Sequence, residues 1–371
     1  MSRQFTLERA MNTRTLLVTG GAGFIGSAYL RKVIAETSWR AVNLDKLTYA
    51  ASPDAVSELQ LSGRYRFVQG DICDSRTVAA LLTAEKPDAI VHFAAETHVD
   101  RSIDGPSKFI ETNIVGTFTV LEAAARYYAA APAETRERFR FHHISTDEVF
   151  GSLDEGKTFD EASPHNPNSP YSASKAASDH LVRAWHRTYG LPIMVTHCSN
   201  NYGPYQFPEK LIPLMTIRAL SGRSLPVYGD GRNVRDWLYV DDHVDALLAV
   251  LERGRVGESY GIGGGVQIDN LELVRTICTI LDRLSPAADR KARQDLITHV
   301  PDRPGHDRRY ATNIEKIARE VGWQPKVTLP SGLQETIEWY LANRAWWEKI
   351  LAGCYTTERL GVVTRRAAAG Q

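Results

Sequence analysis

Two side chains near the middle of the sequence have the types and the spacing of a proton-transfer pair. Tyr171 and Lys175 stand four positions apart, so on a helix they would share one face. A tyrosine phenol, with a free pKa of about 10, is a poor base at neutral pH. A lysine ammonium one turn away favours the phenolate, and a positively charged nicotinamide nearby would lower the phenol pKa further. Tyr171 is therefore a candidate acceptor for the proton of an alcohol that loses hydride, and Thr146 could hold the same hydroxyl by a hydrogen bond.

A second chemical group, the acidic pair Asp147-Glu148, follows a segment that is typical of a buried strand. Residues 139–144 are rich in aromatic and branched side chains, and the chain turns at Gly151. Side chains at the end of such a strand would open onto a cleft. Taken alone, these patterns are weak, because Tyr-x-x-x-Lys also describes an ordinary helix pair and the acidic pair a solvated turn.

The segment from Thr15 to Glu36 has the pattern of a strand, a glycine-rich turn and a helix. Gly21, Gly23 and Gly26 fit the motif G-x-G-x-x-G, and Gly20 adds a further glycine at the turn. Without side chains there, backbone N–H groups at a helix N-terminus can approach a pyrophosphate closely. The flanking elements make a purely structural turn the weaker interpretation.

Two acidic residues follow the next predicted strands. Asp45 ends the strand at 41–44, at the distance where a carboxylate should accept the hydroxyls of an adenosine ribose. That carboxylate would repel a 2′-phosphate, so NAD is favoured over NADP. After the strand at 65–68, Asp71 could reach the adenine and Ile72 could pack on it, although Asp71 could equally cap the following helix.

Strands and helices continue to alternate as far as residue 198. Strands are predicted at 89–95 and 192–198, and helices at 106–128 and 171–189. This alternation predicts an α/β fold with a Rossmann-type, doubly wound parallel sheet and right-handed crossovers. Ligands in such sheets bind beyond the carboxyl ends of the strands, where all the motifs above fall.

After residue 198 the pattern changes to turns, cations and shorter elements, which predicts a smaller mixed α/β substrate-binding domain. The segment 200–210 mixes aromatics with amides and suits a flat polar ring, while 232–237 and 302–310 supply cations for a single diphosphate. Solvated loops with incidental arginines are the alternative. One helix is expected from Leu329 to Leu351, with Ile337, Trp339, Tyr340 and Trp347 packed onto the body. The predicted divisions are an NAD-binding domain at 14–198 plus about 237–263, a sugar-nucleotide-binding domain at 199–236 plus about 264–352, and flexible ends at 1–13 and 356–371.

Composition excludes several classes of function. The chain has 371 residues, is 43% hydrophobic, and has 44 basic and 44 acidic side chains, so no net field recruits nucleic acid or an anionic membrane. No apolar run reaches the length of about 18 residues that a membrane helix needs. The four cysteines form no C-x-x-C pair, which favours a reducing cytoplasm. None of the 11 histidines has a ligand spacing such as H-E-x-x-H, so no bound metal is expected.

Taken together, these segments resemble the extended short-chain dehydrogenase/reductases and, among them, the dTDP-glucose 4,6-dehydratase family, from about Arg14 to Leu351. The glycine and Tyr/Lys motifs mark the superfamily, whereas Asp147-Glu148 and the stretch from Asp302 mark the dehydratases. The resemblance rests on these stretches: Gly20 to Gly26, His98 to Ser102, Ser145 to Val149, Tyr171 to Lys175, Asn200 to Pro204, Arg235 to Trp237 and Asp302 to His306.

The resemblance implies roles for the acidic pair. Oxidation of a hexose at C4 makes the C5 proton acidic, and loss of water across C5 and C6 then needs a base at C5 and an acid at O6. Glu148 would be the base and Asp147 the acid, which must stay protonated in a dry site or beside another negative charge. Hydride then returns from NADH to C6, so the NAD is regenerated and stays bound.

The resemblance also implies ligand contacts and an assembly. Its cofactor contacts, with the glycines Gly20, Gly23 and Gly26, fall on Phe24, Ile25, Asp45, Lys46, Thr48, Asp71, Ile72, Ala94, Ala95, Thr112, Tyr171, Lys175 and Asn200. Its dTDP-glucose contacts fall on Thr97, Thr146, Asn201, Glu209, Lys210, Leu211, Pro226, Tyr228, Arg235, Asn270 and His306. The chain departs from many relatives at Thr97, Phe150 and Ala51, and the first two of these affect fine substrate contacts rather than the chemistry. A homodimer is expected, with the helices from Pro106 and Tyr171 pairing across a two-fold axis.

Other functions stay open at this point. A 4-epimerase or a 4,6-dehydratase for another nucleotide would use the same cofactor site, although an epimerase returns hydride to C4 and has no use for an acid at O6. A nucleotide-binding regulator that lost catalysis would not need the intact Thr146, Tyr171 and Lys175.

Overall fold

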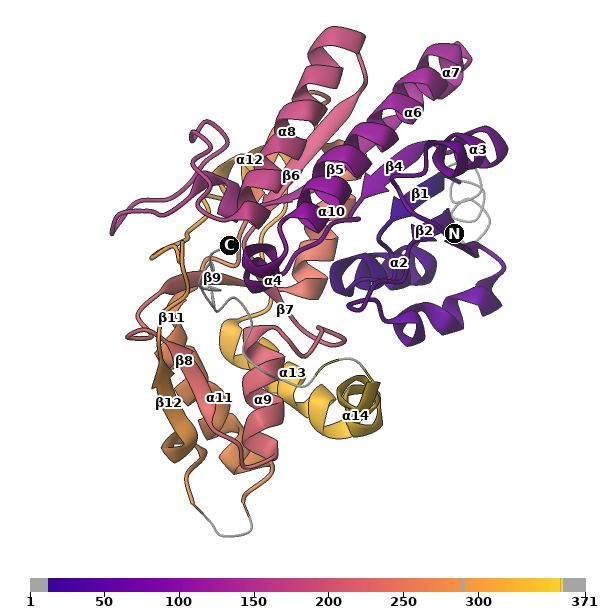
Figure 1. Cartoon of the computed structure of the whole chain (residues 1–371). Helices are drawn as coiled ribbons and strands as arrows, with labels where there is room; N and C mark the ends of the chain where they lie inside the picture. Colours follow the sequence, from indigo (N-terminus) through magenta and orange to yellow (C-terminus); the bar gives the residue numbers. More distant parts are fainter. Residues whose placement is uncertain (1–12, 288–290, 354, 356–371) are drawn as a thin grey trace, which may run out of the picture.

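The computed structural model describes residues 13–287, 291–353 and 355, and Figure 1 shows their arrangement. The predicted flexible ends at 1–13 and 356–371 lie, apart from Thr13, outside these residues. Within the described ranges, no helix has both the length and the apolar character required to cross a membrane.

The larger group of elements is built on a seven-stranded sheet with the order β10-β6-β5-β4-β1-β2-β3. All of its neighbouring strands pair in parallel. This order, in which the chain reverses direction across the sheet between β3 and β4, confirms the predicted doubly wound Rossmann-type sheet. The strands are β1 (Thr15–Thr19), β2 (Arg40–Asp45), β3 (Tyr65–Gln69), β4 (Ala89–His92), β5 (Arg140–Thr146), β6 (Ile193–Cys198) and β10 (Ser259–Ile262).

Helices cover both faces of this sheet, so its strands are buried on each side. In β1, Leu16 and Val18 belong to one apolar cluster and Leu17 to another, as the alternation of side chains along a strand requires. The first cluster includes residues of α2 (Phe24–Glu36), α10 (Val240–Arg253) and α12 (Glu315–Val321), and the second includes residues of α3 (Ser75–Glu85), α6 (Thr117–Ala130) and α8 (Pro170–Tyr189).

The second group of elements lies beneath the first in Figure 1 and has its own apolar core. A three-stranded sheet has the order β11-β9-β7 and a two-stranded sheet pairs β12 with β8. The strands are β7 (Asn200–Tyr202), β8 (Leu225–Tyr228), β9 (Val234–Tyr239), β11 (Gln267–Asp269) and β12 (Ile297–Val300), and the helices are α9 (Leu211–Leu220), α11 (Asn270–Leu284), α13 (Leu329–Ala342) and α14 (Arg344–Gly353). Shorter helical segments are Pro53–Ser62, α4 (Val99–Asp104), α5 (Ser107–Phe109), α7 (Ala133–Arg138), η3 (Asp147–Phe150) and Arg293–Leu296.

Four predicted elements differ from those observed. The strand predicted at 89–95 is β4, which ends earlier, at His92. The strand predicted at 139–144 is β5, which ends later, so Thr146 is its last residue. The helix predicted at 106–128 contains a π-helical segment, Ile110–Gly116, between α5 and α6. The single helix predicted from Leu329 to Leu351 is wrong, because the chain leaves helical geometry at Asn343 with φ −112° and ψ 41°.

The break at Asn343 has a local cause. Its backbone N–H donates to Trp339 O at 2.9 Å, and its side-chain Nδ2 donates to the same carbonyl at 2.8 Å. A short amide side chain that bonds to the backbone in this way competes with continuation of the helix. The turn lets Trp347 Nε1 donate to Tyr340 O at 2.9 Å, and it packs Trp346 against Trp339 with ring centroids 5.1 Å apart.

Candidate active site

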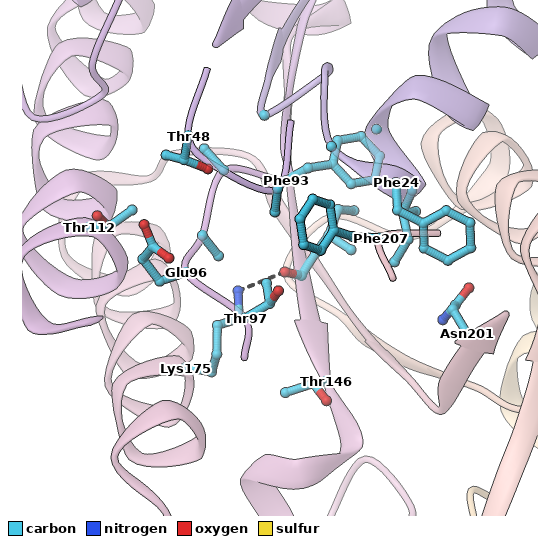
Figure 2. A pocket seen from close by; sticks show the side chains of 18 of the residues that line it. Phe24, Thr48, Phe93, Glu96, Thr97, Thr112, Thr146, Lys175, Asn201 and Phe207 are labelled. Atoms are coloured by element: carbon cyan, nitrogen blue, oxygen red, sulfur yellow. Dashed lines mark hydrogen bonds between the residues drawn. The ribbon is translucent and has the colours of Figure 1, made fainter. Parts of the chain in front are cut away.

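Two adjoining cavities lie where the seven-stranded sheet meets the second group of elements. All the residues predicted to contact the cofactor line the first cavity, together with Thr146, Asp147 and Glu148. The residues predicted to contact the substrate line the first or the second cavity. Five residues line both cavities and so mark their junction: Thr97, Glu148, Asn200, Glu209 and Lys210. In Figure 2, Thr48 and Thr112 lie on one side of the first cavity, and Thr146 and Lys175 lie at its lower end.

The glycine-rich turn forms one wall of the first cavity and is too tightly packed to hold side chains. Gly20 has a positive φ of 73°, and a Cβ there would stand 2.6 Å from the backbone nitrogen of Ala94. A Cβ at Gly26 would stand 2.3 Å from the carbonyl oxygen of Gly20. This close approach of strand, turn and helix leaves bare backbone facing the cavity, as a bound diphosphate requires.

Acidic residues at the end of β2 and shortly after β3 line the same cavity. Asp45 is buried and accepts from the backbone N–H groups of Ala22 at 2.9 Å and Leu47 at 2.8 Å, so it also fixes the glycine-rich turn. Asp71 forms an ion pair with Lys46 at 2.8 Å. The helix that follows is capped by Asp74, so the interpretation of Asp71 as its N-cap is wrong.

Helix α8 presents Tyr171 and Lys175 to the cavity from one face. Ser169 and Ser172 form a reciprocal capping box at its start, which fixes where the helix begins. Both functional side chains are buried, and Lys175 Nζ donates to Ile144 O at 2.8 Å. The lysine is therefore anchored to β5, the strand that carries Thr146.

The π-helical segment holds α8 in place beside it. Asn113 Nδ2 donates to Ser174 Oγ at 2.8 Å, and Ser178 Oγ donates to the backbone oxygen of Asn113 at 2.6 Å. Asn113 also exchanges hydrogen bonds with the backbone of Glu96. A π-bulge frees backbone groups that an α-helix would use internally, and such bulges occur frequently at functional sites. Here the bulge ties α8 to the loop after β4 and brings Thr112 to the cavity wall.

The phenol of Tyr171 is not activated by the protein alone. Burial raises its pKa well above the ordinary value, and the nearby Glu148 raises it further, whereas hydrogen bonding with Thr146 acts in the opposite direction. Burial lowers the pKa of Lys175, and the carboxylate of Asp179 opposes that shift. A positive charge brought by a ligand would favour the phenolate of Tyr171, which is the part that the sequence analysis expected a nicotinamide to play.

The two acidic side chains after β5 lie in different environments. Thr146 Oγ1 accepts from the backbone N–H of Glu148 at 3.3 Å and so starts the short helix η3. Asp147 is 1% exposed, and burial raises its pKa well above the ordinary range, with Glu148 and Asp236 adding to the rise. Its Oδ2 has no hydrogen-bond partner within the described part of the chain. These conditions keep Asp147 protonated.

Glu148 faces the cations of the second cavity. Burial raises its pKa too, but Arg303, Arg235 and Lys210 oppose the rise. Arg235 acts on both carboxyl groups, but Asp147 has Glu148 and Asp236 as its larger charged influences, whereas Glu148 has three cations ahead of Asp307, which pushes their proton affinities apart. Such a separation is the usual way in which neighbouring carboxyl groups take the roles of acid and base.

The second cavity combines cations with apolar walls. Arg235 Nη2 donates to the backbone oxygen of Asp307 at 2.9 Å, and its guanidinium carbon lies 4.4 Å from the Tyr310 ring centroid. Arg303 Nη1 contacts Asp100 Oδ1 at 2.9 Å, whereas its buried Nε has no hydrogen-bond partner among the described residues. Fixed guanidinium groups with unused donors suit the phosphates of a nucleotide ligand.

Sequence reasoning placed Glu209 among the substrate contacts, and the structure adds a role within the protein. Its carboxylate accepts from Tyr49 Oη at 2.9 Å and from Arg101 Nε at 3.0 Å. The contacts predicted from the sequence omit several residues that line the cavities, including Glu96, Phe207, Arg218 and Arg303. Arg303 lies within the cation-rich stretch at 302–310 and could have been found there, whereas Arg218 lies on α9 with no local signal.

Comparison with known proteins gives consistent matches along almost the whole chain. The family model described as GDP-mannose 4,6 dehydratase matches residues 17–336. A dTDP-glucose 4,6-dehydratase from Neisseria meningitidis serogroup B is 56% identical over 353 residues, which covers 94% of this chain and 99% of the relative. A crystal structure of the dTDP-glucose 4,6-dehydratase from Streptomyces venezuelae, with NAD bound, is 48% identical, has a TM-score of 0.82, and is matched over 91% of this chain and 99% of that one.

A more distant structure shares the fold. The UDP-glucose 4-epimerase of Thermotoga maritima, solved with UDP-glucose, is 28% identical with a TM-score of 0.77, over 89% of this chain and 99% of that one.

Proposed function

The chain belongs to the dTDP-glucose 4,6-dehydratase family of the extended short-chain dehydrogenase/reductases, and from this membership and its site we propose that it converts dTDP-glucose to the 4-keto-6-deoxy sugar with NAD as cofactor. The reaction oxidises C4, removes water across C5 and C6, and reduces C6. It needs no external oxidant, because the hydride taken from C4 is the one returned to C6.

The observation that carries this proposal is the pairing of unlike carboxyl groups beside the Tyr171 and Lys175 pair. Asp147 is buried beside Glu148 and Asp236, whereas the charge of Glu148 is balanced by Arg235 and Arg303. A dehydratase needs an acid at O6 and a base at C5 at the same time. A 4-epimerase needs neither, so the acidic pair favours dehydration.

The cavity around the glycine-rich turn fits NAD. Gly20 and Gly26 have no room for a Cβ, so the turn presents backbone without side chains at these positions for the diphosphate. The buried Asp45 favours ribose hydroxyls over a phosphate. We assign the cofactor contacts to the residues that line this cavity and that the sequence resemblance named. NAD, when bound, supplies the hydride acceptor and donor of the reaction.

The protein's own residues move the protons. We propose that Tyr171 accepts the proton of the C4 hydroxyl, that Lys175 holds positive charge near the phenol, and that Thr146 orients that hydroxyl. Glu148 removes the proton from C5 and returns one at the end, and Asp147 donates a proton to O6 as water leaves. The carbonyl of Ile144, which accepts from Lys175 Nζ at 2.8 Å, keeps the lysine at this distance from β5.

The second cavity would hold the nucleotide diphosphate. Arg235, Arg303 and Lys210 supply positive charge there, and Leu211, Pro226 and Tyr228 supply walls. His306 lies at the same wall, with its ring centroid 6.2 Å from that of Tyr228. Such a mixture of cations and flat or apolar side chains suits a base, a ribose and two phosphates.

We also propose the domain division expected from the sequence, with the NAD-binding domain at 14–198 plus about 237–263 and the sugar-nucleotide-binding domain at 199–236 plus about 264–352. The enzyme would work in the cytoplasm as a homodimer. Cys73, Cys198 and Cys278 are free among the described residues, which supports a reducing compartment.

The direct test is to incubate the protein with dTDP-glucose and record the NMR spectrum of the product. A 6-deoxy methyl signal supports the proposal, whereas a galactose-type product without that signal would support a 4-epimerase. Running UDP-glucose and GDP-mannose in parallel identifies a dehydratase for another nucleotide.

A variant of the proposed base makes the test specific to the mechanism. Glu148→Gln should still oxidise C4, which the absorbance of reduced nicotinamide reports, but it should lose turnover by ~100-fold or more because the C5 proton has no base. Full turnover in this variant would remove Glu148 from the mechanism.

A further inference from the structure

A buried group of histidines surrounds Asp179, which lies on α8 one turn beyond Lys175. His165 comes from the loop before α8, Asp179 from α8 and His197 from β6. The Nε2 of His197 lies 2.9 Å from Asp179 Oδ2, and the Nε2 of His165 lies 3.8 Å from the same oxygen. The ligand atoms of the three residues all lie within 4.8 Å of one another. None of them lines the two active-site cavities.

Several polar atoms in this group lack a hydrogen-bond partner. Both ring nitrogens of His165, Nδ1 of His197 and Oδ1 of Asp179 are buried and have no such partner in the described part of the chain. Asp179 is fully buried and His197 is 1% exposed. Buried polar atoms are normally hydrogen-bonded, so the unpaired His165 Nε2 beside Asp179 points to a bound ion or water. An ion there would replace the hydrogen bond between His197 Nε2 and Asp179 Oδ2.

We propose that His165 Nε2, His197 Nε2 and Asp179 Oδ2 bind one zinc ion. Two imidazoles and a carboxylate are a donor set that zinc prefers, with bonds of about 2.0–2.1 Å in tetrahedral geometry. Such bonds place neighbouring ligand atoms about 3.3 Å apart. The two distances to Asp179 Oδ2, 2.9 and 3.8 Å, lie on either side of this value. The remaining separation, between the two imidazoles, lies within 4.8 Å, so the His165 ring would have to move toward His197 to complete the site.

A fourth side chain is placed to support the carboxylate. His143 Nε2 lies 3.3 Å from Asp179 Oδ1, the carboxylate oxygen that does not bind zinc, and the His143 side chain is fully buried. Ligating carboxylates are commonly held by such a neighbour, which fixes their orientation. The fourth coordination position remains for water. Linear spacing gave no metal signal because the ligands come from three segments that only the fold brings together.

The proposed ion would fasten the loop between β5 and α8 to the body of the protein. His165 lies on this loop, which follows the η3 segment carrying the acidic pair, whereas Asp179 and His197 lie on rigid elements. We assign the ion a structural role because its ligands line neither active-site cavity, although its water-filled fourth position differs from a closed structural site. The alternative is a hydrogen-bonded histidine cluster around a buried carboxylate, with no affinity for metal.

The test uses the full chain after removal of metals with a chelator and dialysis. Zinc is titrated by calorimetry, and cobalt is titrated in parallel because tetrahedral cobalt gives visible absorption. We expect one site per chain, visible absorption with cobalt, and a higher melting temperature with zinc. His165→Ala and His197→Asn should weaken binding by roughly 10–100-fold or more, since even supporting residues have effects of that size.

A histidine outside the cluster provides the matched control. His299 is exposed and contacts Gly229 O, so His299→Ala should leave zinc affinity unchanged. His165 is the least buried of the three ligands, so His165→Ala should fold even if substitutions of Asp179 do not, and circular dichroism checks this. Absence of a zinc site in the parent chain, or equal affinity in His165→Ala and the control, would overturn the proposal.

Discussion

At the scale of single residues, the site depends on how differently two adjacent carboxyl groups are surrounded. Asp147 is almost wholly buried, and among the described residues Thr146 Oγ1 alone donates to its Oδ1, at 3.4 Å. Glu148 lies at the junction of the two cavities and faces guanidinium groups. Because they interact, the pair titrates as a unit, and its two steps belong to the pair. The lower step should produce Glu148 carboxylate and the upper step should remove the proton of Asp147.

The pH profile follows from the sign of these shifts. The pKa of Glu148 is raised, so turnover should fall as the pH drops through that raised value and the base becomes protonated. The pKa of Asp147 is raised further, so turnover should fall again as the pH rises through it and the acid is lost. Asp147→Asn should lower kcat by ~100-fold or more and abolish the alkaline limb.

A neighbouring carboxylate provides the control for this assignment. Asp236 raises the pKa of Asp147 by its charge, and burial raises the pKa of Asp236 itself to about 6. Asp236→Asn should therefore move the alkaline limb to lower pH without removing it. The measurement is kcat against pH in the parent chain, Asp147→Asn and Asp236→Asn. An alkaline limb that persists unchanged in Asp147→Asn would mean that a group other than Asp147 produces this limb.

At the scale of elements, the turn between β1 and α2 shows why two of its glycines admit no side chain. A Cβ at Gly26 would stand 2.3 Å from Gly20 O and 2.8 Å from Gly21 Cα, and both atoms belong to backbone. Gly26→Ala should therefore displace the turn and weaken NAD binding by about 1–3 kcal/mol, the usual cost of overpacking. Nucleotide released from the purified, denatured variant measures the NAD retained.

Gly105 is the matched control for this substitution. A Cβ there would approach nothing closer than Arg101 O, at 3.9 Å, and its φ of −148° suits any residue. Gly105→Ala should retain NAD as the parent chain does. Equal NAD content in the two alanine variants would show that the turn tolerates a side chain at Gly26.

Local signals explain which elements the sequence could predict. The strand at Thr15–Thr19, the glycine-rich turn and the end of α2 at Glu36 were predicted because their pattern lies within one short stretch. The start of α8 was predicted because Ser169-Pro170 is a local helix signal. The parallel sheet followed from the alternation of such elements.

The remaining features depend on contacts between distant residues. The break at Asn343 is stabilised by packing among tryptophans on either side of it, which periodicity does not record. The π-helical segment is held by Ser174 and Ser178, far along the chain. The zinc ligands and Arg303 likewise come together only through the tertiary fold. The spacing of residues along the sequence therefore indicated the catalytic candidates, whose motif is short. It did not indicate residues from distant segments that come together only in the fold.

At the scale of the whole molecule, exposed apolar side chains gather on the helices that the family resemblance assigns to a dimer interface. Ile110 and Val115 on the π-helical segment are 47% and 46% exposed, and Phe118 on α6 is 44% exposed. Tyr189 at the end of α8 is 59% exposed. Apolar side chains that cluster on one surface mark an interaction site more often than scattered ones do. A two-fold pairing would bury the same side chains on both subunits.

Phe118 is the position at which this proposal can be tested without disturbing the fold. Its ring meets Trp185 of α8 edge-on, with centroids 5.8 Å apart, and its outer edge faces solvent. Phe118→Glu would place two uncompensated carboxylates in a symmetric interface, so we expect dissociation into monomers by sedimentation velocity. Leu61→Glu, at a side chain 90% exposed on the Pro53–Ser62 segment, should leave the dimer intact.

Because the π-helical segment also carries Thr112 to the cofactor cavity, the Phe118→Glu monomer should retain less NAD than the dimer. A parent chain that sediments as a monomer, or a Phe118→Glu variant that remains a dimer, would exclude this face as the interface.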